Sequence, residues 1–378
     1  MRLLIVTGIF PPEIGGSATY SALLRHELPR SGVAVSVLTY GSARGERVFC
    51  VSQRWPKGLR HLIYFFRALA LALRHDVVLA ADASVGAGFM TALALTLAPR
   101  PFAVRVTGDY AWEQGVQRFG VRERMDEFQA VREKAAFPVR VLSFCQAFTL
   151  RRAALVIAPS RYLKGIVAGW GVPEKKIAVI YNAFERPTLA RSRQSVKQSL
   201  GLTGYTMVAA GRLLPWKGFG LLIKLWAELR STLDGWNFII VGDGPERDRL
   251  EALNRKVDAG IVFTGVLPRE RLLEYLCASD LFVLNTAYEG FSHQLLEALS
   301  MGLAVLTTRV GGNGEVIADG RNGFLVDYND TQAFRERLVQ LAGDGALRER
   351  LGEEAVRTVS TFSVQRMVGE TLQSLGRL

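Results

Sequence analysis

Two glutamates, Glu289 and Glu297, stand eight positions apart in the segment EGFSHQLLEA, around Gly290 and the expected start of a helix. Beyond Gly290 the apolar residues recur with helical period, and Ser292 is suited to cap that helix. Unpaired backbone N–H groups at a helix start suit a phosphate. The two carboxylates can accept hydrogen bonds from sugar hydroxyls beyond it. A simpler interpretation, one solvated glutamate on a helix and another on a loop, is weighed against the rest of the chain.

Two cations, Arg212 and Lys217, follow an expected strand in the segment GRLLPWKG. The planar guanidinium and the compact ammonium are both suited to a diphosphate. Parallel sheets bind ligands beyond the carboxyl ends of their strands, where these residues are expected. Taken alone, two surface cations beside a helix start are the simpler interpretation.

Two glycine-rich loops also follow expected strands: VGDGP, with Gly242 and Asp243, and PPEIGG, with Gly15 and Gly16. Glycine permits a tight turn with positive φ and lets a ligand approach the backbone closely. VGDGP does not match the G-x-G-x-x-G dinucleotide fingerprint. A structural turn and a ligand loop therefore both stay open for each segment, the second as a backbone cradle for phosphate.

The sequence predicts no metal site and no bound cofactor. Its four histidines are not at ligand spacing, and no Asp-x-Asp pair offers a metal bridge to a diphosphate. Arg212, Lys217 and the helix start after Gly290 would therefore have to stabilise a leaving phosphate electrostatically.

Strand and helix patterns alternate along the whole chain, as in parallel sheets covered by helices. With 378 residues, two domains are expected. We predict an α/β protein of two Rossmann-like, doubly wound domains that face a cleft, over 1–185 and 200–361, with a polar linker near 183–200. The expected strands are 3–7, 33–39, 77–80, 102–106, 155–158, 177–180, 206–210, 236–241, 261–264, 281–285 and 304–308.

The charge of the chain is unevenly distributed. Residues 1–185 contain 24 Lys+Arg and 13 Asp+Glu, a net charge of +11, whereas residues 186–378 contain 23 and 22, a net charge of +1. The basic half predicts an anionic partner: membrane lipid, a phosphorylated acceptor or nucleic acid. Three widely spaced cysteines fit a reducing cytoplasm, and no apolar run is long enough to span a bilayer.

The chain resembles the family 4 glycosyltransferases of the GT-B fold in motifs that occur in the family's order over nearly its whole length. These are FPPEIGG, APS at 158–160, VIYNAF at 179–184, GRLLPWKG, VGDGPE, FTG at 263–265, EGFSHQLLEALSMGLAV, and the segments 311–317 and 322–326. The resemblance implies a retaining enzyme that uses a nucleotide-activated sugar. It also implies that segment 362–378 crosses back to the first domain.

The resemblance implies a role for each matching residue. Arg212 and Lys217 would hold the donor diphosphate, Glu297 the ribose and Glu289 the transferred sugar. Backbone near Val266 would contact the base, and Gly16 would approach the diphosphate. The expected donor-binding set is Gly15, Gly16, Arg212, Lys217, Gly242, Asp243, Val266, Glu289, Gly290, Phe291, Ser292 and Glu297.

One position departs from the family pattern. Many members have a histidine after the strand at 102–106, where this chain has VTGDYAWE and no histidine. Asp109 is a candidate for the equivalent catalytic place, beside Arg212, Lys217 and Glu289, and capping of a helix by Asp109 is the alternative. Retention in this family is attributed to same-face attack, in which the donor phosphate helps to deprotonate the acceptor, so the reaction class does not depend on the histidine.

Two basic and apolar stretches raise the question of a membrane. Residues 54–75 have cations around an aromatic and aliphatic body, typical of a helix in a membrane interface, with a core helix as the alternative. Residues 118–152 interleave arginines with phenylalanines. We expect a cytoplasmic enzyme, in peripheral contact with anionic lipid, that uses a UDP- or GDP-sugar. Its acceptor is expected to be a lipid-linked sugar, with a soluble sugar or sugar phosphate as the alternative. We expect the enzyme to act in bacterial cell-surface polysaccharide or glycolipid biosynthesis. A non-catalytic nucleotide-binding module is the less favoured alternative, suggested by the missing histidine. We expect no nucleic acid as a partner, because a nucleic-acid-binding protein would leave the two glutamates unexplained.

Overall fold

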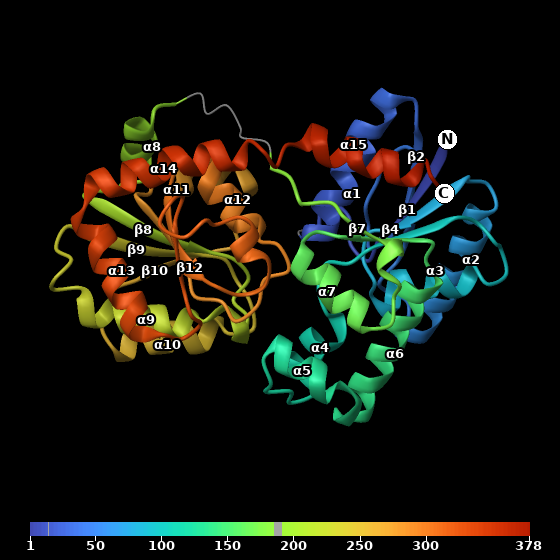
Figure 1. Ribbon diagram of the computed structural model, residues 1–378, viewed down its shortest axis with the longest axis horizontal. Helices are drawn as coiled ribbons and strands as arrows, with labels where there is room; N and C mark the ends of the chain where they lie inside the picture. Colours follow the sequence, from blue (N-terminus) through green and yellow to red (C-terminus); the bar gives the residue numbers. More distant parts are fainter. Residues whose placement is uncertain (14, 185–190) are drawn as a thin grey trace. The chain divides into compact units, whose positions relative to one another are not determined.

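The computed structural model describes residues 1–13, 15–184 and 191–378, and it divides into two compact units with one parallel sheet each (Figure 1). Unit 1 comprises Met1–Tyr181 and Gln365–Leu378, and unit 2 comprises Asn182–Val364. The predicted α/β class with two doubly wound sheets is confirmed.

The sheet of unit 1 has seven parallel strands in the order β3-β2-β1-β4-β5-β6-β7. Its central strands are continuous apolar runs because both faces are covered. The sequence analysis missed β3, an edge strand that is only partly buried and therefore lacks such a run. The strands are β1 (Arg2–Val6), β2 (Ala34–Tyr40), β3 (Val48–Val51), β4 (Val77–Ala80), β5 (Phe102–Arg105), β6 (Leu155–Ala158) and β7 (Ile177–Val179).

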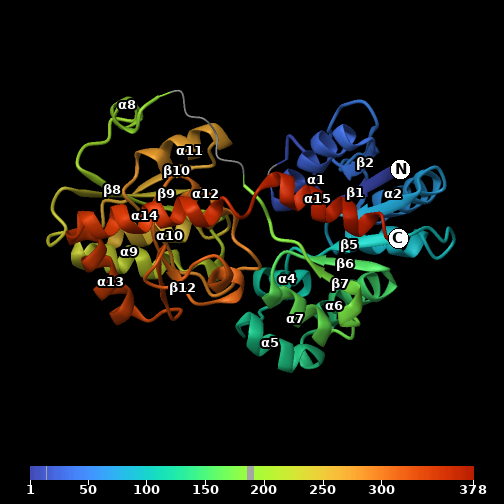
Figure 2. The same ribbon diagram turned by 45° about the horizontal axis from the view of Figure 1, so that its top comes forward.

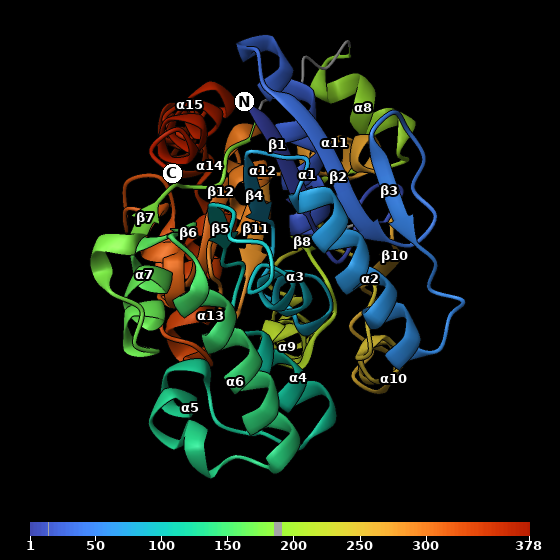
Figure 3. The same cartoon turned by 90° about the vertical axis from the view of Figure 1, so that its right-hand side faces the viewer.

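One face of this sheet is covered by α2 (Lys57–Ala72), α3 (Met90–Ala94), α6 (Phe137–Arg152) and α7 (Arg161–Gly169), which contribute to one apolar core (Figure 3). Between β5 and α6 the chain forms α4 (Tyr110–Arg118) and α5 (Met125–Val131). Helix α1 (Gly16–Glu27) lies beside the C-terminal helix α15 (Val364–Leu375) (Figures 1 and 2). Shorter helical segments are Leu28–Ser31, Val85–Phe89, Arg132–Lys134 and Glu174–Lys176.

The sheet of unit 2 has six parallel strands in the order β10-β9-β8-β11-β12-β13. They are β8 (Tyr205–Ala210), β9 (Trp236–Val241), β10 (Val262–Gly265), β11 (Leu281–Leu284), β12 (Ala304–Thr308) and β13 (Phe324–Val326). The helices are α8 (Arg193–Ser199), α9 (Phe219–Leu229), α10 (Arg247–Lys256), α11 (Arg269–Ala278), α12 (His293–Ser300), α13 (Thr331–Gly343) and α14 (Gly345–Val359), with short turns at Pro215–Lys217 and Gly311–Glu315.

The polar stretch expected to be a linker is in part a helix. Residues 185–190 lie outside the described residues, but the stretch continues into α8, which packs against α11. Ser192 caps α8 by accepting a hydrogen bond from Ser195 N. Arg193 and Lys197 form ion pairs with Asp280 at 2.6 and 3.2 Å. The polar composition that suggested a linker therefore belongs partly to a surface helix held by charge.

In each sheet the direction of winding reverses once: between β1 and β4 in unit 1, and between β8 and β11 in unit 2. Loops that follow strands on either side of such a point leave in opposite directions. The carboxyl edge there is where open α/β sheets bind ligands. In unit 2 the loops after β8 and β11 contain the motifs singled out in the sequence.

Candidate active site

The glycine loops after β8 and β9 are locked together at the carboxyl edge of unit 2. Gly242 has φ 138°, and a Cβ added to it would lie 1.9 Å from the carbonyl oxygen of Gly211. Leu213 N donates to Asp243 O at 2.8 Å. Glycine at position 242 is therefore required by backbone packing, which is the structural alternative kept open for the VGDGP loop.

Lys217 and Glu289 form an ion pair between the loops after β8 and β11. Their side chains are 10% and 9% exposed, so water screens this pair weakly. The same two loops are joined by Ala287 N, which donates to Trp216 O at 2.7 Å. The structure thus brings together two residues that are 72 positions apart, one expected to contact the diphosphate and the other the sugar.

The backbone around Glu289 is fixed from a third loop. Gly312 N donates to Glu289 O at 2.9 Å, and a Cβ on Gly311 would lie 1.9 Å from that oxygen. Gly311 has φ 55°, so its position demands glycine on both steric and conformational grounds. The paired glycines after β12 therefore hold the glutamate loop in place.

Helix α12 begins as expected. Ser292 Oγ accepts from Leu295 N at 3.4 Å and caps it. Gly290 and Phe291 precede the cap and are buried. Phe291 O accepts a hydrogen bond from Asn182 Nδ2 at 3.1 Å. Asn182 lies in the VIYNAF motif, which was noted in the sequence without a role for this residue; the structure makes it a support for the start of α12.

Glu297 is half-buried on α12, beyond Ser292. Burial raises the pKa of its carboxyl to about 7, and the nearby Arg269 acts in the opposite direction. Its carboxylate makes no hydrogen bond within the described part of the chain, which leaves both oxygens available to hydroxyl donors. Arg269 was missed in the sequence because its proximity arises from the loop after β10, not from any spacing to Glu297.

The remaining donor-site candidates in unit 2 differ from one another in exposure and in their contacts. Arg212 is exposed and has no hydrogen-bond or ion-pair partner among the described residues. Asp243 is held by Arg247 Nη1 at 2.8 Å, and this contact lowers the pKa of its carboxyl. Val266, after β10, is 61% exposed, an apolar surface at the edge of the site.

Gly15, Gly16 and Asp109 belong to unit 1. Gly15 is the residue before α1, and Gly16 is exposed at its first turn. Asp109 has no exposed surface. It caps α4 by accepting from Ala111 N and Trp112 N, both at 3.1 Å, and its other oxygen contacts Arg132 Nη1 at 2.6 Å.

The contacts seen for Asp109 are those of the capping alternative. Both of its carboxylate oxygens are bonded within unit 1, and the side chain presents no surface to a ligand. The expectation that Asp109 occupies the place of the family's histidine near the sugar is therefore not supported. The physical reason for these contacts is that Asp109 caps α4 and neutralises the buried guanidinium of Arg132.

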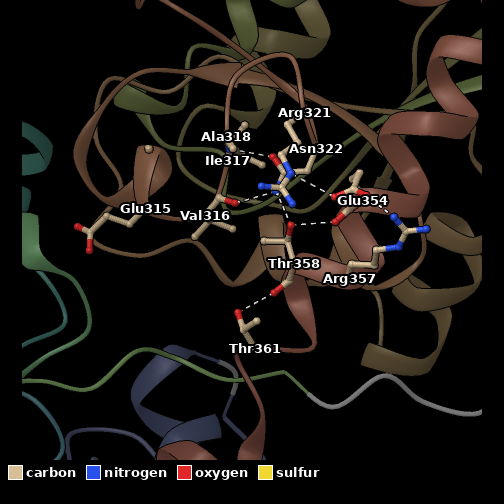
Figure 4. A pocket seen from close by; sticks show the side chains of 11 residues that line it. Glu315, Val316, Ile317, Ala318, Arg321, Asn322, Glu354, Arg357, Thr358 and Thr361 are labelled. Carbon is tan, nitrogen blue, oxygen red and sulfur yellow. Dashed lines mark hydrogen bonds and ion pairs between the residues drawn. The ribbon is translucent and has the colours of Figure 1, made fainter.

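A hollow of unit 2, about 440 Å³, lies beside α14 and is shown in Figure 4. Its polar side chains satisfy one another: Asn322 Nδ2 donates to Thr358 Oγ1 at 3.0 Å, and Arg321 pairs with Glu354 at 3.2 Å. Asn322 also bonds the backbone of Val316 and Ala318. Asn322, the first residue of the motif at 322–326, therefore holds the preceding loop against α14.

The described residues contain neither a cluster of metal ligands nor a membrane-spanning helix. Across 1–13, 15–184 and 191–378, no three acidic, histidine or cysteine side chains are grouped to hold a metal, and metal-independent stabilisation stays a prediction. Within the same ranges no helix combines the length and the apolar character needed to cross a bilayer.

The two doubly wound units place the chain among the open-sheet α/β proteins, and in unit 2 the switch point gathers cations, glycine loops and a helix start. The sequence family "Glycosyl transferase 4-like domain" matches residues 15–183, and "Glycosyl transferases group 1" matches residues 191–358. The chain belongs to the family 4 glycosyltransferases with the GT-B fold.

Individual relatives match part of the chain. The lipopolysaccharide core biosynthesis glycosyltransferase LpsE of Rhizobium meliloti (strain 1021) is 33% identical over 172 residues, 45% of this chain and 49% of that protein. The D-inositol 3-phosphate glycosyltransferase of Corynebacterium efficiens is 32% identical over 191 residues, 48% of this chain and 45% of that protein. The chain thus spans about half the length of these curated relatives.

A solved structure matches over the full length. Anabaena Alr3699/HepE, crystallised in complex with UDP and glucose, has a TM-score of 0.78 and 21% sequence identity, with 100% of both chains covered. At that identity the likeness concerns the fold.

Proposed function

We propose that this protein is a retaining glycosyltransferase that moves a sugar from a UDP- or GDP-sugar to an acceptor hydroxyl in the assembly of a bacterial surface polysaccharide or glycolipid. The main support is the buried ion pair between Lys217 and Glu289, at the carboxyl ends of the two strands that flank the switch point. The start of α12, Arg212 and the unbonded carboxyl of Glu297 surround the same edge. A diphosphate, a hexose and a ribose would each find partners there.

The proposed roles follow from the chemistry of each group. Lys217 and Arg212 would offset the charge that develops on the leaving phosphate. Since Lys217 already contacts Glu289, the diphosphate would share the ammonium with that carboxylate, whose oxygens would accept from hydroxyls of the transferred sugar. Glu297 would accept from the ribose.

In the proposed transfer, the bond from the sugar's anomeric carbon to the donor phosphate breaks. A bond to the acceptor oxygen forms on the same face of the sugar. The acceptor's proton moves to the departing phosphate, so no protein base is required. Closure over the donor would limit hydrolysis.

The proposed acceptor is lipid-linked, and the protein would act in the cytoplasm at the membrane's inner face. The basic first half of the chain supports this, as does similarity to a protein named for lipopolysaccharide core biosynthesis. Similarity to a D-inositol 3-phosphate glycosyltransferase favours a second candidate, the same chemistry on a soluble sugar phosphate. Transfer that is unchanged by removal of all membrane or detergent would select the second.

The donor assignment can be tested with paired variants. Removing one partner of a buried ion pair leaves an uncompensated charge, so Lys217→Met or Glu289→Gln alone would lower stability as well as activity. The double variant Lys217→Met/Glu289→Gln removes both charges. We expect it to recover most of the stability and none of the sugar transfer.

The matched control is Lys197→Met/Asp280→Asn, a lysine–carboxylate pair with side chains 16% and 13% exposed, formed between α8 and the residue before β11 at the opposite edge of the same sheet. It should retain UDP- or GDP-sugar turnover. Titration calorimetry with UDP, GDP and ADP would identify the base. Full turnover by the double variant at the Lys217–Glu289 pair would refute the site.

A further inference from the structure

Unit 1 contains a cavity of about 960 Å³ that the donor site does not use. It lies between segment 129–134, α6 and α7. Gly165 and Gly169, one turn apart on α7, line it, and a Cβ added to either would meet nothing within 4 Å. Helix α7 therefore leaves this side open.

Two polar atoms of the lining residues are buried without a hydrogen-bond partner in the described structure: Arg132 Nη2 and Ser143 Oγ. Arg132 is held in place by Asp109, and its guanidinium lies over the Trp170 ring, 4.5 Å from the centroid. Buried donors are nearly always satisfied, so two unsatisfied donors beside one cavity point to a missing acceptor.

The charges around the cavity specify that acceptor. Four cations line it, Arg132, Lys134, Arg140 and Arg151, against one carboxylate, Glu133. Lys134 and Arg140 are exposed and make no ion pair within the described residues. Arg151 donates from Nε and Nη2 to Trp170 O at 3.0 and 2.7 Å. The donors that remain are the Ser143 hydroxyl, Arg132 Nη2, Lys134 and Arg140, and this set fits a phosphate group.

The outer surface of the same helical layer contains exposed apolar side chains. Exposed side chains recur at helical spacing, which places them on one side of each helix. Phe144, 66% exposed, belongs to this set and also lines the cavity. The set is Trp55, Leu59, Leu62, Phe66 and Leu73 on or beside α2, Leu93 and Leu97 on or after α3, and Phe137, Val141 and Phe144 on α6.

These three helices are neighbours: α3 contacts both α2 and α6 (Figure 3). Segment 52–75 contains five cations and no aspartate or glutamate, and segment 137–152 contains three cations and neither acid. Helix α2 buries Tyr64, Ala68 and Ala72 against the sheet and exposes its other apolar side. It therefore covers the sheet, as the core-helix alternative expected, while its exposed apolar side leaves the interfacial role a prediction.

We propose that the cavity between α6 and α7 binds the phosphate of a membrane lipid while the exposed apolar side chains of α2, α3 and α6 lie in the interface of an anionic bilayer. A second copy of this chain is a poorer occupant, because two such surfaces would bring together four cations and one carboxylate from each copy, an excess of like charge. The inference deepens the proposed function, on which its purpose rests: it would hold unit 1 where a lipid-linked acceptor is found.

The test is co-sedimentation of the full chain with vesicles of phosphatidylglycerol and phosphatidylcholine, compared with pure phosphatidylcholine. We expect binding to the anionic vesicles that weakens with salt. Lys134→Gln/Arg140→Gln should weaken it about thirtyfold, from about fivefold for each cation. Arg255→Gln/Lys256→Gln, an exposed pair on α10 with the same change in charge, should bind like wild type.

Two further variants separate the parts of the surface. Ser143→Ala should weaken binding to anionic vesicles without a change in net charge, which a diffuse electrostatic attraction would not produce. Leu62→Ser/Phe66→Ser should weaken it as well, whereas Val339→Ser, exposed on α13, should not. Equal effects of the cavity variant and its α10 control, or no effect of Ser143→Ala, would overturn the cavity assignment.

Further measurements distinguish a lipid phosphate from free phosphate, and failure of this inference from failure of the proposed function. Thermal stabilisation by free inorganic phosphate, lost in Ser143→Ala, without any vesicle binding would overturn the membrane-lipid assignment. A dimer in solution that Leu62→Ser/Phe66→Ser dissociates would do the same. Release of UDP or GDP from the donor, measured without vesicles, should be unchanged in Lys134→Gln/Arg140→Gln. Vesicle binding without donor turnover would instead defeat the proposed function.

Discussion

Replacing Glu297 by glutamine tests whether α12 holds a carboxyl group whose charged form is disfavoured. Burial raises the pKa of this carboxyl from its ordinary 4.5 to about 7, despite the opposing effect of Arg269. Glutamine has nearly the same shape and stays neutral at every pH. The difference between the two proteins therefore isolates the ionisation of Glu297.

The sign follows from proton binding. Between pH 4.5 and about 7 the unfolded chain releases the carboxyl proton while the folded protein keeps it, so the free energy of unfolding falls as the pH rises. The contribution is fully present below pH 4.5 and is lost as the pH passes about 7. At about 1.36 kcal/mol per pKa unit the loss is at most about 3 kcal/mol, and partial exposure of the side chain reduces it to about 2 kcal/mol.

The assay is denaturant unfolding of wild type, Glu297→Gln and the exposed control Glu270→Gln between about pH 4.5 and pH 8. At the acidic end, wild type and Glu297→Gln should differ least. At the alkaline end, Glu297→Gln should be the more stable by about 2 kcal/mol, while Glu270→Gln follows wild type. Parallel stability curves for wild type and Glu297→Gln would refute the reasoning.

The same carboxyl links pH to ligand binding. If ribose hydroxyls donate to the charged form, a bound nucleotide favours loss of the proton. Nucleotide affinity should then rise with pH below about 7, by no more than about tenfold per pH unit, and calorimetry in buffers of different ionisation enthalpy should detect proton release. Glu297→Gln should abolish both effects.

Two further predictions concern positions that the structure assigns to packing. Gly242→Ala should cost about 3 kcal/mol or more, because its Cβ would overlap the carbonyl of Gly211, whereas Gly314→Ala, with open space, should cost under about 1 kcal/mol in denaturant unfolding. Asp109→Ala should destabilise by about 3–5 kcal/mol by leaving Arg132 without its counter-charge, and Asp109→Asn by less. Nucleotide affinity measured by calorimetry should be unchanged in both Asp109 variants, and a loss of affinity at wild-type stability would contradict the structural role.

The strands that the sequence predicted well are those with continuous apolar runs. Central strands such as β9 and β12 are buried on both faces, so composition alone marks them. The strands β3 and β13 are at sheet edges, with four and three residues, and give no comparable pattern. Helix α8 was hidden for a related reason: it is polar, and its ion pairs with Asp280 join it to a residue more than 80 positions away.

The donor edge could be anticipated as a set of residues but not as an arrangement. Position after a strand was enough to place Arg212, Lys217 and Glu289 on one edge, because the strands are parallel. Position after a strand did not predict the ion pair between Lys217 and Glu289. That contact depends on how the two loops are joined through the backbone of Trp216. The supports at Asn182 and Gly311 are likewise backbone contacts, for which a sequence pattern shows at most that glycine or asparagine is present.

Asp109 shows how burial decides between two roles that local sequence permits. A carboxylate one residue before a helix is suited both to capping and to catalysis, and both need the same residue type. The two roles differ in what the second oxygen contacts. Here it accepts hydrogen bonds from Arg132 and Gln129, which lie in the segment beyond α4. Asp109 is therefore engaged within unit 1, and the proposed same-face transfer, in which the donor phosphate would take the acceptor's proton, does not call on its carboxylate.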